Sequence, residues 1–286
     1  IEFQKLDRVI RENIPSGFEI RKAPNHRAQE FPYEELYCLK SINKDKSEKS
    51  LGTLGGGNHF IEVDRSSDGT LYMTVHSGSR HTGEEAAEYY TKIAAAGLKE
   101  KGIDIPYYQR WLTGKSAQEY IHDVQLLERY AVLNREIIIA EILKGMKLKS
   151  VEQFSVPHNY IDSAGVLHKG SISACAGEKV VIPVNMRDGV ILGTGKGNEE
   201  WNCSAPHGSG RIIKRSDVKN MHTVSEFKKA MNGIYSSCLA ADTLDESPFA
   251  YRSISDIAER IKDTVDIDDI LTPIYSYKAG SGKKVR

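Results

Sequence analysis

The sequence lacks several features that would assign it quickly to a class. Its four cysteines, Cys38, Cys175, Cys203 and Cys238, form no Cys-x-x-Cys pair, which argues against a zinc finger or disulfide framework and favours a reducing, cytoplasmic setting. No apolar run approaches the ~18 residues of a membrane helix, and no signal-peptide pattern opens the chain. The 39 basic and 39 acidic residues cancel, which excludes nucleic-acid binding by bulk charge but not a local basic groove.

What is present is a mixture of helical and β patterns. Apolar spacing or alanine-rich charged stretches predict helices over 6–11, 84–100, 117–146 and 255–265. β-Forming runs predict strands over 59–63, 71–76, 154–157, 180–183 and 190–192. The Thr223-x-x-Glu226 spacing predicts a capped helix start. We expect one α+β domain over 1–286, with a β-rich core flanked by helices and a flexible tail over 281–286. Within 117–146 the expected apolar stripe is Ile121, Val124, Leu127, Ala131, Ile138 and Ile142.

Four of the nine histidines have unusual neighbours. His59, His76, His158 and His207 lie at the ends of expected strands or within turns of small residues, where a sheet presents side chains to a site. Imidazole is the commonest metal ligand and suits manganese, zinc, iron or nickel. A partly buried structural ring is the alternative for each one. Spacing alone does not decide whether three bind a metal and one does not.

Three glycine-rich stretches, 55–57, 193–197 and 208–210, are candidates for cradling phosphates with backbone amides. None is a Walker A loop, and tight turns are the alternative. The stretch His207-Gly208-Ser209-Gly210-Arg211 is more specific. A neutral imidazole is a competent nucleophile toward phosphorus, and the arginine four residues on can offset phosphate charge. Basic and aromatic residues do not interleave as in a single-strand-binding platform.

Taken together, these motifs resemble the RtcB family of RNA ligases. The matching segments, in the family's order, are 51–62, 76–80, 157–160, 168–171, 197–200, 207–211 and 250–252, followed by Lys278. The resemblance implies a single RtcB-like catalytic domain that uses GTP and Mn²⁺, two ions per site. It implies that RNA 3′-phosphate or 2′,3′-cyclic phosphate ends are joined to 5′-hydroxyl ends. A guanylated histidine and an RNA end capped by GMP are the implied intermediates.

The resemblance also implies a role for each matching residue. His207 matches the guanylated histidine, and His59, His76 and His158 match three manganese ligands. The nucleotide-binding set that it implies, together with two arginines chosen for their charge, is Asn58, Phe60, Glu62, Arg80, His158, Asn185, Gly208, Ser209, Arg211, Tyr251 and Lys278. Within this set Glu62 would read the guanine edge, since a carboxylate accepts from its N–H donors.

Two departures from the family pattern bear on these expectations. The family's Asp-x-Gly-Cys-Gly stretch, which binds the metals, is not in this sequence, and Ile1 reads like mid-domain sequence, so we expect a segment upstream. The stretch 183–189 carries Asn185, Arg187 and Asp188 where many members have Pro-Gly-Ser-Met-Gly, which indicates a divergent branch. Whether the substrate belongs to tRNA splicing, repair of cleaved RNA or another 3′-phosphate end stays open.

Two alternatives to a ligase remain. One is a metal-dependent phosphoesterase on RNA ends, with His207 as acid or base, turning over without GTP. The other is an inactive relic that binds nucleotide or RNA, suggested by the absent Asp and Cys ligands. A covalent GMP adduct that needs His207 separates the ligase from both.

Overall fold

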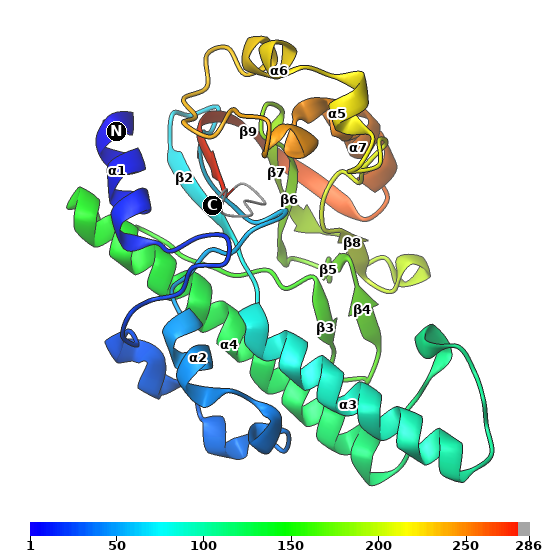
Figure 1. Ribbon diagram of the computed structural model, residues 1–286. Coiled ribbons are helices and arrows are strands. Elements are labelled where there is room, and N and C mark those ends of the chain that lie inside the picture. The colour runs from blue at the N-terminus through cyan, green and yellow to red at the C-terminus, as the bar shows by residue number, and fades with distance from the viewer. Residues whose placement is uncertain (280–286) are drawn as a thin grey trace.

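The fold is built around a five-stranded antiparallel sheet with the order β2-β1-β9-β7-β6 (Figure 1). The computed structural model describes residues 1–279, so the expected tail over 281–286 lies outside the described residues. β1 (Phe60–Arg65) and β2 (Leu71–His76) form one hairpin, and β6 (Lys179–Asn185) and β7 (Gly189–Gly195) form another. Both hairpins match the strands that the sequence predicts there.

The two hairpins are joined by β9 (Val265–Lys278), which the sequence did not predict. The first half of β9 pairs with β7 and its second half pairs with β1. The helix expected over 255–265 ends early, as α7 (Ile254–Ile261), because Val265 already pairs with Gly195 on β7. Long-range pairing therefore decides the structure of this segment.

Two small sheets lie beside the main one. β3 (Asn159–Ile161) pairs with β4 (Leu167–Lys169), and β5 (Ser171–Ser173) pairs with β8 (Ser204–Pro206). The strand expected over 154–157 is wrong, since regular pairing begins only at Asn159. These short strands carry residues from distant parts of the sequence to one end of the main sheet.

The helices lie on the outside of the sheet. The long pair α3 (Arg80–Glu100) and α4 (Lys115–Met146) runs side by side, while α1 (Phe3–Asn13) packs on α4 (Figure 1). The others are α2 (Lys44–Ser50), α5 (Val218–Met221) and α6 (Val224–Ala230), the last of which begins with the expected capping box at Thr223. The observed class is thus mixed α+β, as expected.

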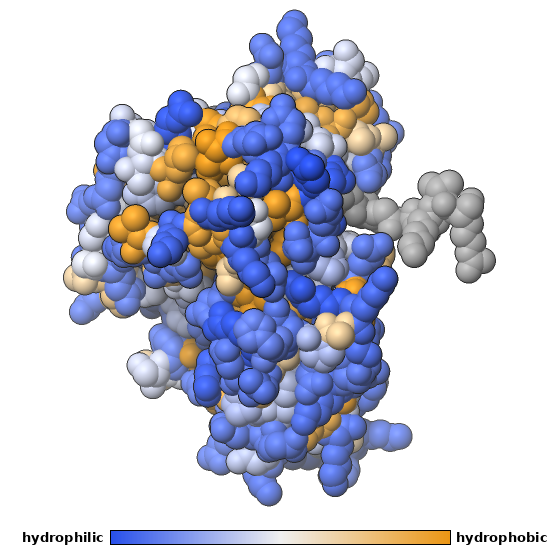
Figure 2. All heavy atoms as spheres, turned by 90° about the vertical axis from the view of Figure 1, so that its left-hand side faces the viewer, coloured by the Kyte–Doolittle hydropathy of each residue, from blue (hydrophilic) through white to orange (hydrophobic). Residues whose placement is uncertain are grey.

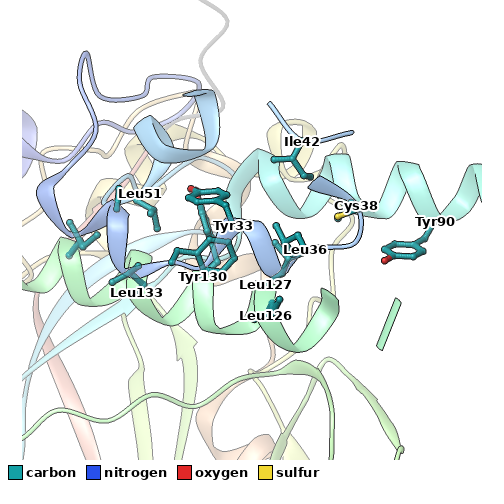
Figure 3. Close-up of a cluster of buried hydrophobic side chains, with 14 residues drawn as sticks. Tyr33, Leu36, Cys38, Ile42, Leu51, Tyr90, Leu126, Leu127, Tyr130 and Leu133 are labelled. Atoms are coloured by element: carbon teal, nitrogen blue, oxygen red, sulfur yellow. The ribbon is translucent and has the colours of Figure 1, made fainter. Parts of the chain in front are cut away.

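Helix α4 connects two hydrophobic clusters. Tyr130 and Leu133 pack with Tyr33 and Leu51 from the N-terminal segment (Figure 3), whereas Ile138 packs into the cluster beneath β1 and β9. Of the expected stripe, Leu127, Ile138 and Ile142 are buried, but Ile121 is 37% exposed.

None of the helices within residues 1–279 combines the length and the hydropathy that a membrane span requires. The face in Figure 2 is mainly hydrophilic, with hydrophobic side chains gathered in its upper half.

Candidate functional site

The strand register brings several predicted residues to one end of the sheet. Phe60 pairs with His76 on β2 and with Lys278 on β9, so these three residues form one row. Side chains alternate across a strand, so Glu62 lies on the same face as Phe60. His59 precedes this row directly. The predicted strand-end location of the first two histidines is confirmed.

The four candidate histidines form a line of neighbouring rings. The ring centroids are 5.4 Å apart for His59 and His76, 5.3 Å for His76 and His158, and 4.8 Å for His158 and His207. They come from segments between 59 and 207 in the sequence. The fold therefore gathers all four, as the motif pattern predicts.

In two of these histidines, a hydrogen bond to a backbone carbonyl determines which ring nitrogen carries the proton. Nδ1 of His59 lies 2.8 Å from the carbonyl oxygen of Leu54, and Nδ1 of His207 lies 2.6 Å from that of Gly170. A carbonyl only accepts, so each Nδ1 carries the proton and donates it. In the neutral ring Nε2 then has a free lone pair, available to a metal or to an electrophile. Burial, with Arg80 nearby, lowers the pKa of His59 to about 4 and keeps its ring neutral.

His76 and His158 face each other through their Nε2 atoms, which are 3.2 Å apart. Burial lowers the pKa of both rings, so both are neutral at pH 7. Two imidazole nitrogens that each lie about 2.1 Å from a shared cation are separated by roughly 3–3.4 Å. The buried Nδ1 of His158 has no hydrogen-bond partner among the described residues. This pair therefore fits two ligands of one metal ion.

The complete metal centre is not formed by the residues that the structure describes. Within 1–279, no group of three or more His, Cys, Asp or Glu side chains is arranged to hold a metal ion. His59 is a neighbour of the pair rather than an arranged third ligand. The structure thus brings the three expected ligands together but supports only two as a metal-binding pair.

The glycine-rich loop 55–57 makes room for Arg80. Gly55 has a φ of +84°, and a Cβ at this position would lie 1.9 Å from Nη1 of Arg80. At Gly57, in contrast, a Cβ would meet nothing within 4 Å. Arg80 Nε donates to Thr53 Oγ1 at 3.2 Å, and Nη1 lies 3.4 Å from His59 Nδ1 as a neighbouring positive charge, since that nitrogen already carries its own proton. One role of this loop is therefore to seat the partly buried Arg80 guanidinium beside the histidines.

A buried carboxylate, Glu246, organises the other predicted cations. Its oxygens accept from Lys278 Nζ at 2.8 Å, Tyr251 Oη at 2.6 Å, Arg211 Nη1 at 3.3 Å and Arg215 Nη2 at 2.6 Å. Burial alone would raise the pKa of Glu246, but Lys278, Tyr251 and Arg215 together hold it below the ordinary value. Three residues expected around the nucleotide, Arg211, Tyr251 and Lys278, are therefore connected through one group.

Two carboxyl groups lie on the same face of β1. Glu62 is buried, and burial raises its pKa to about 7. Asp64 is also buried, and burial together with the Glu62 charge raises its pKa too. Oδ1 of Asp64 has no hydrogen-bond partner among the described residues. Such a carboxyl can switch between accepting and donating a hydrogen bond near neutral pH.

The remaining candidates are divided between the site and its supporting turns. The side chain of Asn185 is used inside the β6–β7 turn, where it donates to Asp188 and accepts from the Arg187 and Asp188 amides. Ser209 donates to the Val184 carbonyl, and Asn58 is exposed just before β1. A Cβ on Gly208 would lie 3.2 Å from the Pro183 carbonyl oxygen. Asn185 is thus engaged as a turn residue in this structure.

The sequence did not indicate three charged residues near these groups. Glu246 and Arg215 belong to the ion-pair cluster just described. Arg135 on α4 donates to the Ser77 carbonyl at 2.9 Å and to Ser155 Oγ at 2.6 Å, and its charge contributes to lowering the pKa of His158. The only local signal for Arg215 is its place four residues after Arg211; the other two are found through tertiary contacts.

A cavity of about 1270 Å³ lies next to this region, between segments 11–23 and 237–243. Its walls include Arg11, Arg21, Lys22 and Lys278, but none of the histidines. Lys278 is therefore shared between the cavity and the Glu246 cluster.

Known proteins resemble this chain over nearly its whole length. Residues 4–279 match the family described as tRNA-splicing ligase RtcB. The chain is 29% identical to the RNA-splicing ligase RtcB of Escherichia coli K12 over 298 residues, covering 96% of this chain and 71% of that protein. It is 27% identical to the tRNA-splicing ligase RtcB of Archaeoglobus fulgidus (90% of this chain, 66% of that protein) and 26% identical to that of Pyrobaculum aerophilum (76% and 56%). With its histidines gathered at one end of the sheet, the chain belongs to the RtcB family of tRNA-splicing ligases.

Proposed function

We propose that the chain is a GTP-dependent RNA ligase that joins 3′-phosphate or 2′,3′-cyclic phosphate ends to 5′-hydroxyl ends. The observation that carries this proposal is the 2.6 Å hydrogen bond from His207 Nδ1 to the Gly170 carbonyl oxygen. It fixes the tautomer in which Nε2 has the lone pair of a nucleophile. Membership of the RtcB family supports RNA as the substrate.

In the proposed reaction, Nε2 of His207 attacks the α-phosphorus of GTP. A P–N bond forms, the bond to the bridging oxygen breaks, and pyrophosphate leaves. An oxygen of the RNA 3′-phosphate then attacks the GMP phosphorus and frees His207; a cyclic phosphate is hydrolysed first. Finally the 5′-hydroxyl loses its proton and attacks the RNA phosphorus, and GMP leaves as the new phosphodiester forms.

The other residues supply charge and recognition. Arg80 and Arg211 offset phosphate charge, because a guanidinium matches phosphate oxygens with paired donors. Glu62, when ionised, accepts from the N–H donors of guanine. Tyr251 and Lys278, which both donate hydrogen bonds to Glu246, would cover the guanine base of the bound nucleotide.

The metal proposal rests on the histidine pair. His76 and His158 would hold Mn²⁺ through Nε2, as the 3.2 Å separation of these two atoms indicates. His59, with Nε2 free, is the nearest candidate for a further ligand. A bound Mn²⁺ would offset the negative charge of the triphosphate.

Incubation with GTP labelled at the α-phosphate and Mn²⁺, followed by denaturing electrophoresis, tests this proposal. We expect a labelled protein band that is lost in His207→Ala. His26→Ala is the matched control, because His26 is exposed and outside the line of rings, and its band should persist.

A label on His207→Ala at the wild-type level would show that another residue is the nucleophile. RNA-end hydrolysis that requires His207 but neither GTP nor an adduct would instead favour the phosphoesterase.

A further inference from the structure

The connector between α3 and α4 presents three aromatic rings to solvent. Tyr107 is 67% exposed, Tyr108 80% and Trp111 47%. All three fall within five consecutive residues, at the far end of the two long helices (Figure 1). We call residues 102–114 the α3–α4 tip. Large rings are seldom left so open together unless something binds them.

Backbone hydrogen bonds order the segment that carries these rings. Pro106 precedes a short 3₁₀ turn (Tyr107–Gln109), closed by the bonds from Gln109 N to Pro106 O at 2.9 Å and from Arg110 N to Tyr107 O at 3.3 Å. Leu112 packs against the core cluster between α3 and α4 and anchors the far side. The backbone that carries the rings is therefore ordered, and each aromatic side chain has only two torsions to fix when a ligand covers it.

The charge around the rings has a small basic excess. Lys99, Lys101, Arg110 and Lys115 lie in or beside the tip, against Glu100, Asp104 and Glu119, and Glu119 pairs with Lys115 at 3.6 Å. The guanidinium carbon of Arg110 lies 5.8 Å from the centre of the Tyr107 ring. Aromatic faces beside basic groups bind single-stranded nucleic acid, because bases stack on the rings while the cations contact phosphates. Local sequence did not predict this surface, because folding decides which rings stay exposed.

Helix α3 sets the distance from the tip to the histidines. It begins at Arg80, whose guanidinium contacts His59, and it has 21 residues. At 1.5 Å per residue, its far end is about 30 Å from that start. An RNA strand whose end lies at His207 would reach the tip only with nucleotides well away from that end.

We propose that Tyr107, Tyr108 and Trp111 form a second RNA site, on which bases of a single-stranded segment remote from the reacting end stack. The choice of RNA as ligand rests on the proposed function. An acidic protein is the competing occupant of the same surface.

Fluorescence of Trp111 tests the stacking directly. The chain has two tryptophans, so Trp201→Phe leaves Trp111 as the only one. Titration of this variant with a single-stranded RNA of about 12 nucleotides should quench its emission to saturation. Unchanged emission while RNA binds would overturn the proposal.

Affinity measurements separate stacking from general attraction. Tyr107→Ala with Tyr108→Ala should weaken binding of the same RNA by about tenfold or more, and the two Phe variants should retain it. Tyr37→Ala is the control, because this ring is 56% exposed but lies outside the tip. Arg110→Gln should reduce the slope of log affinity against log salt by about 0.7. Equal affinities for the Ala and Phe variants would contradict a stacking site.

Ligation of short and long RNAs distinguishes this proposal from the proposed function. Tip variants should join ends too short to span about 30 Å at the wild-type rate but join longer strands more slowly. Failure of the wild type to join any ends would overturn the ligase function while leaving the quenching result in place. Equal slowing of short and long RNAs would overturn the remote site.

Discussion

At the residue scale, the position of His207 depends on Gly170. Gly170 accepts the Nδ1 hydrogen bond, has a φ of +67°, and would place a Cβ 3.3 Å from Cε1 of His207. We expect Gly170→Ala to displace the imidazole and slow GMP adduct formation by about tenfold or more, since small misplacements of a reacting group are costly. The rate of adduct formation measures this.

Gly165→Ala is the matched control for that substitution. Gly165 also has a positive φ, +83°, but a Cβ there would meet nothing within 4 Å. It should cost similar backbone strain without slowing adduct formation. Equal rate losses in both variants would assign the effect to strain alone.

Among the charged groups of the site, Glu246 should contribute most to the free energy of unfolding. Glu246→Gln leaves Lys278, itself only 8% exposed, and Arg211 without their carboxylate, whereas Arg215 keeps its ion pair with Asp245 at 3.0 Å. We expect a loss of about 3 kcal/mol in the free energy of unfolding, measured in urea. Glu152→Gln, which removes only a surface partner of Lys179, should change it by less than about 1 kcal/mol.

The loss of stability in Glu246→Gln should depend on pH. The folded-state pKa of Glu246 is lowered, so its contribution is present above the ordinary glutamate pKa, about 4.3, and is lost as pH falls through the folded value. The stability gap between wild type and Glu246→Gln should therefore narrow in acid. A gap that widens there would contradict the assigned ion pairs.

The proposed recognition of guanine by Glu62 should depend on pH near neutrality. Its pKa is raised to about 7, and only the ionised form accepts both guanine donors. Guanosine affinity should therefore fall as pH drops below 7, by up to about tenfold per unit. Guanosine is the probe because it has no phosphate to titrate. Calorimetry on Glu62→Gln should show weak binding that is independent of pH; a pH dependence that survives would assign the titration to another group.

At the element scale, α4 is the main support between the two hydrophobic clusters. Ile138 is fully buried beneath the sheet, while Ile121 on the same helix is 37% exposed. Ile138→Ala should lower the free energy of unfolding by about 2–5 kcal/mol and Ile121→Ala by less than about 1 kcal/mol. Chemical denaturation of the two variants checks this; similar losses would contradict the observed burial.

Elements with strong local patterns were predictable from sequence, and those stabilised from a distance were not. The β1–β2 hairpin and the Thr223 cap follow from residues close in sequence. β9 contains Asp266, Asp268 and Asp269, which disfavour strands, yet it forms because β1 and β7 pair with it. Pairing partners of this kind cannot be read from the strand itself.

The residues of the site likewise divide into those that a local sequence pattern marks and those that only tertiary contacts reveal. The four histidines were identified because small residues and strand ends mark them locally. Glu246 has no such marker, since its importance comes from Lys278 and Arg215 at distant positions. Asn185 was a reasonable nucleotide ligand by its type, but the β6–β7 turn uses its hydrogen bonds.

At the scale of the whole molecule, the five-stranded sheet, the short strands and α4 converge on one line of imidazoles with arginines beside it. In the proposed reaction, this arrangement would serve the transfer of GMP from GTP to His207 and then to an RNA end. The chain's membership of the RtcB family agrees with that chemistry.

A joining assay with two pairs of RNA ends, with GTP and Mn²⁺ supplied, tests the proposed ligase activity directly. We expect a joined product from 3′-phosphate and 5′-hydroxyl ends, dependent on GTP and lost in His207→Ala. Joining of 3′-hydroxyl and 5′-phosphate ends, or joining that needs neither GTP nor His207, would contradict it.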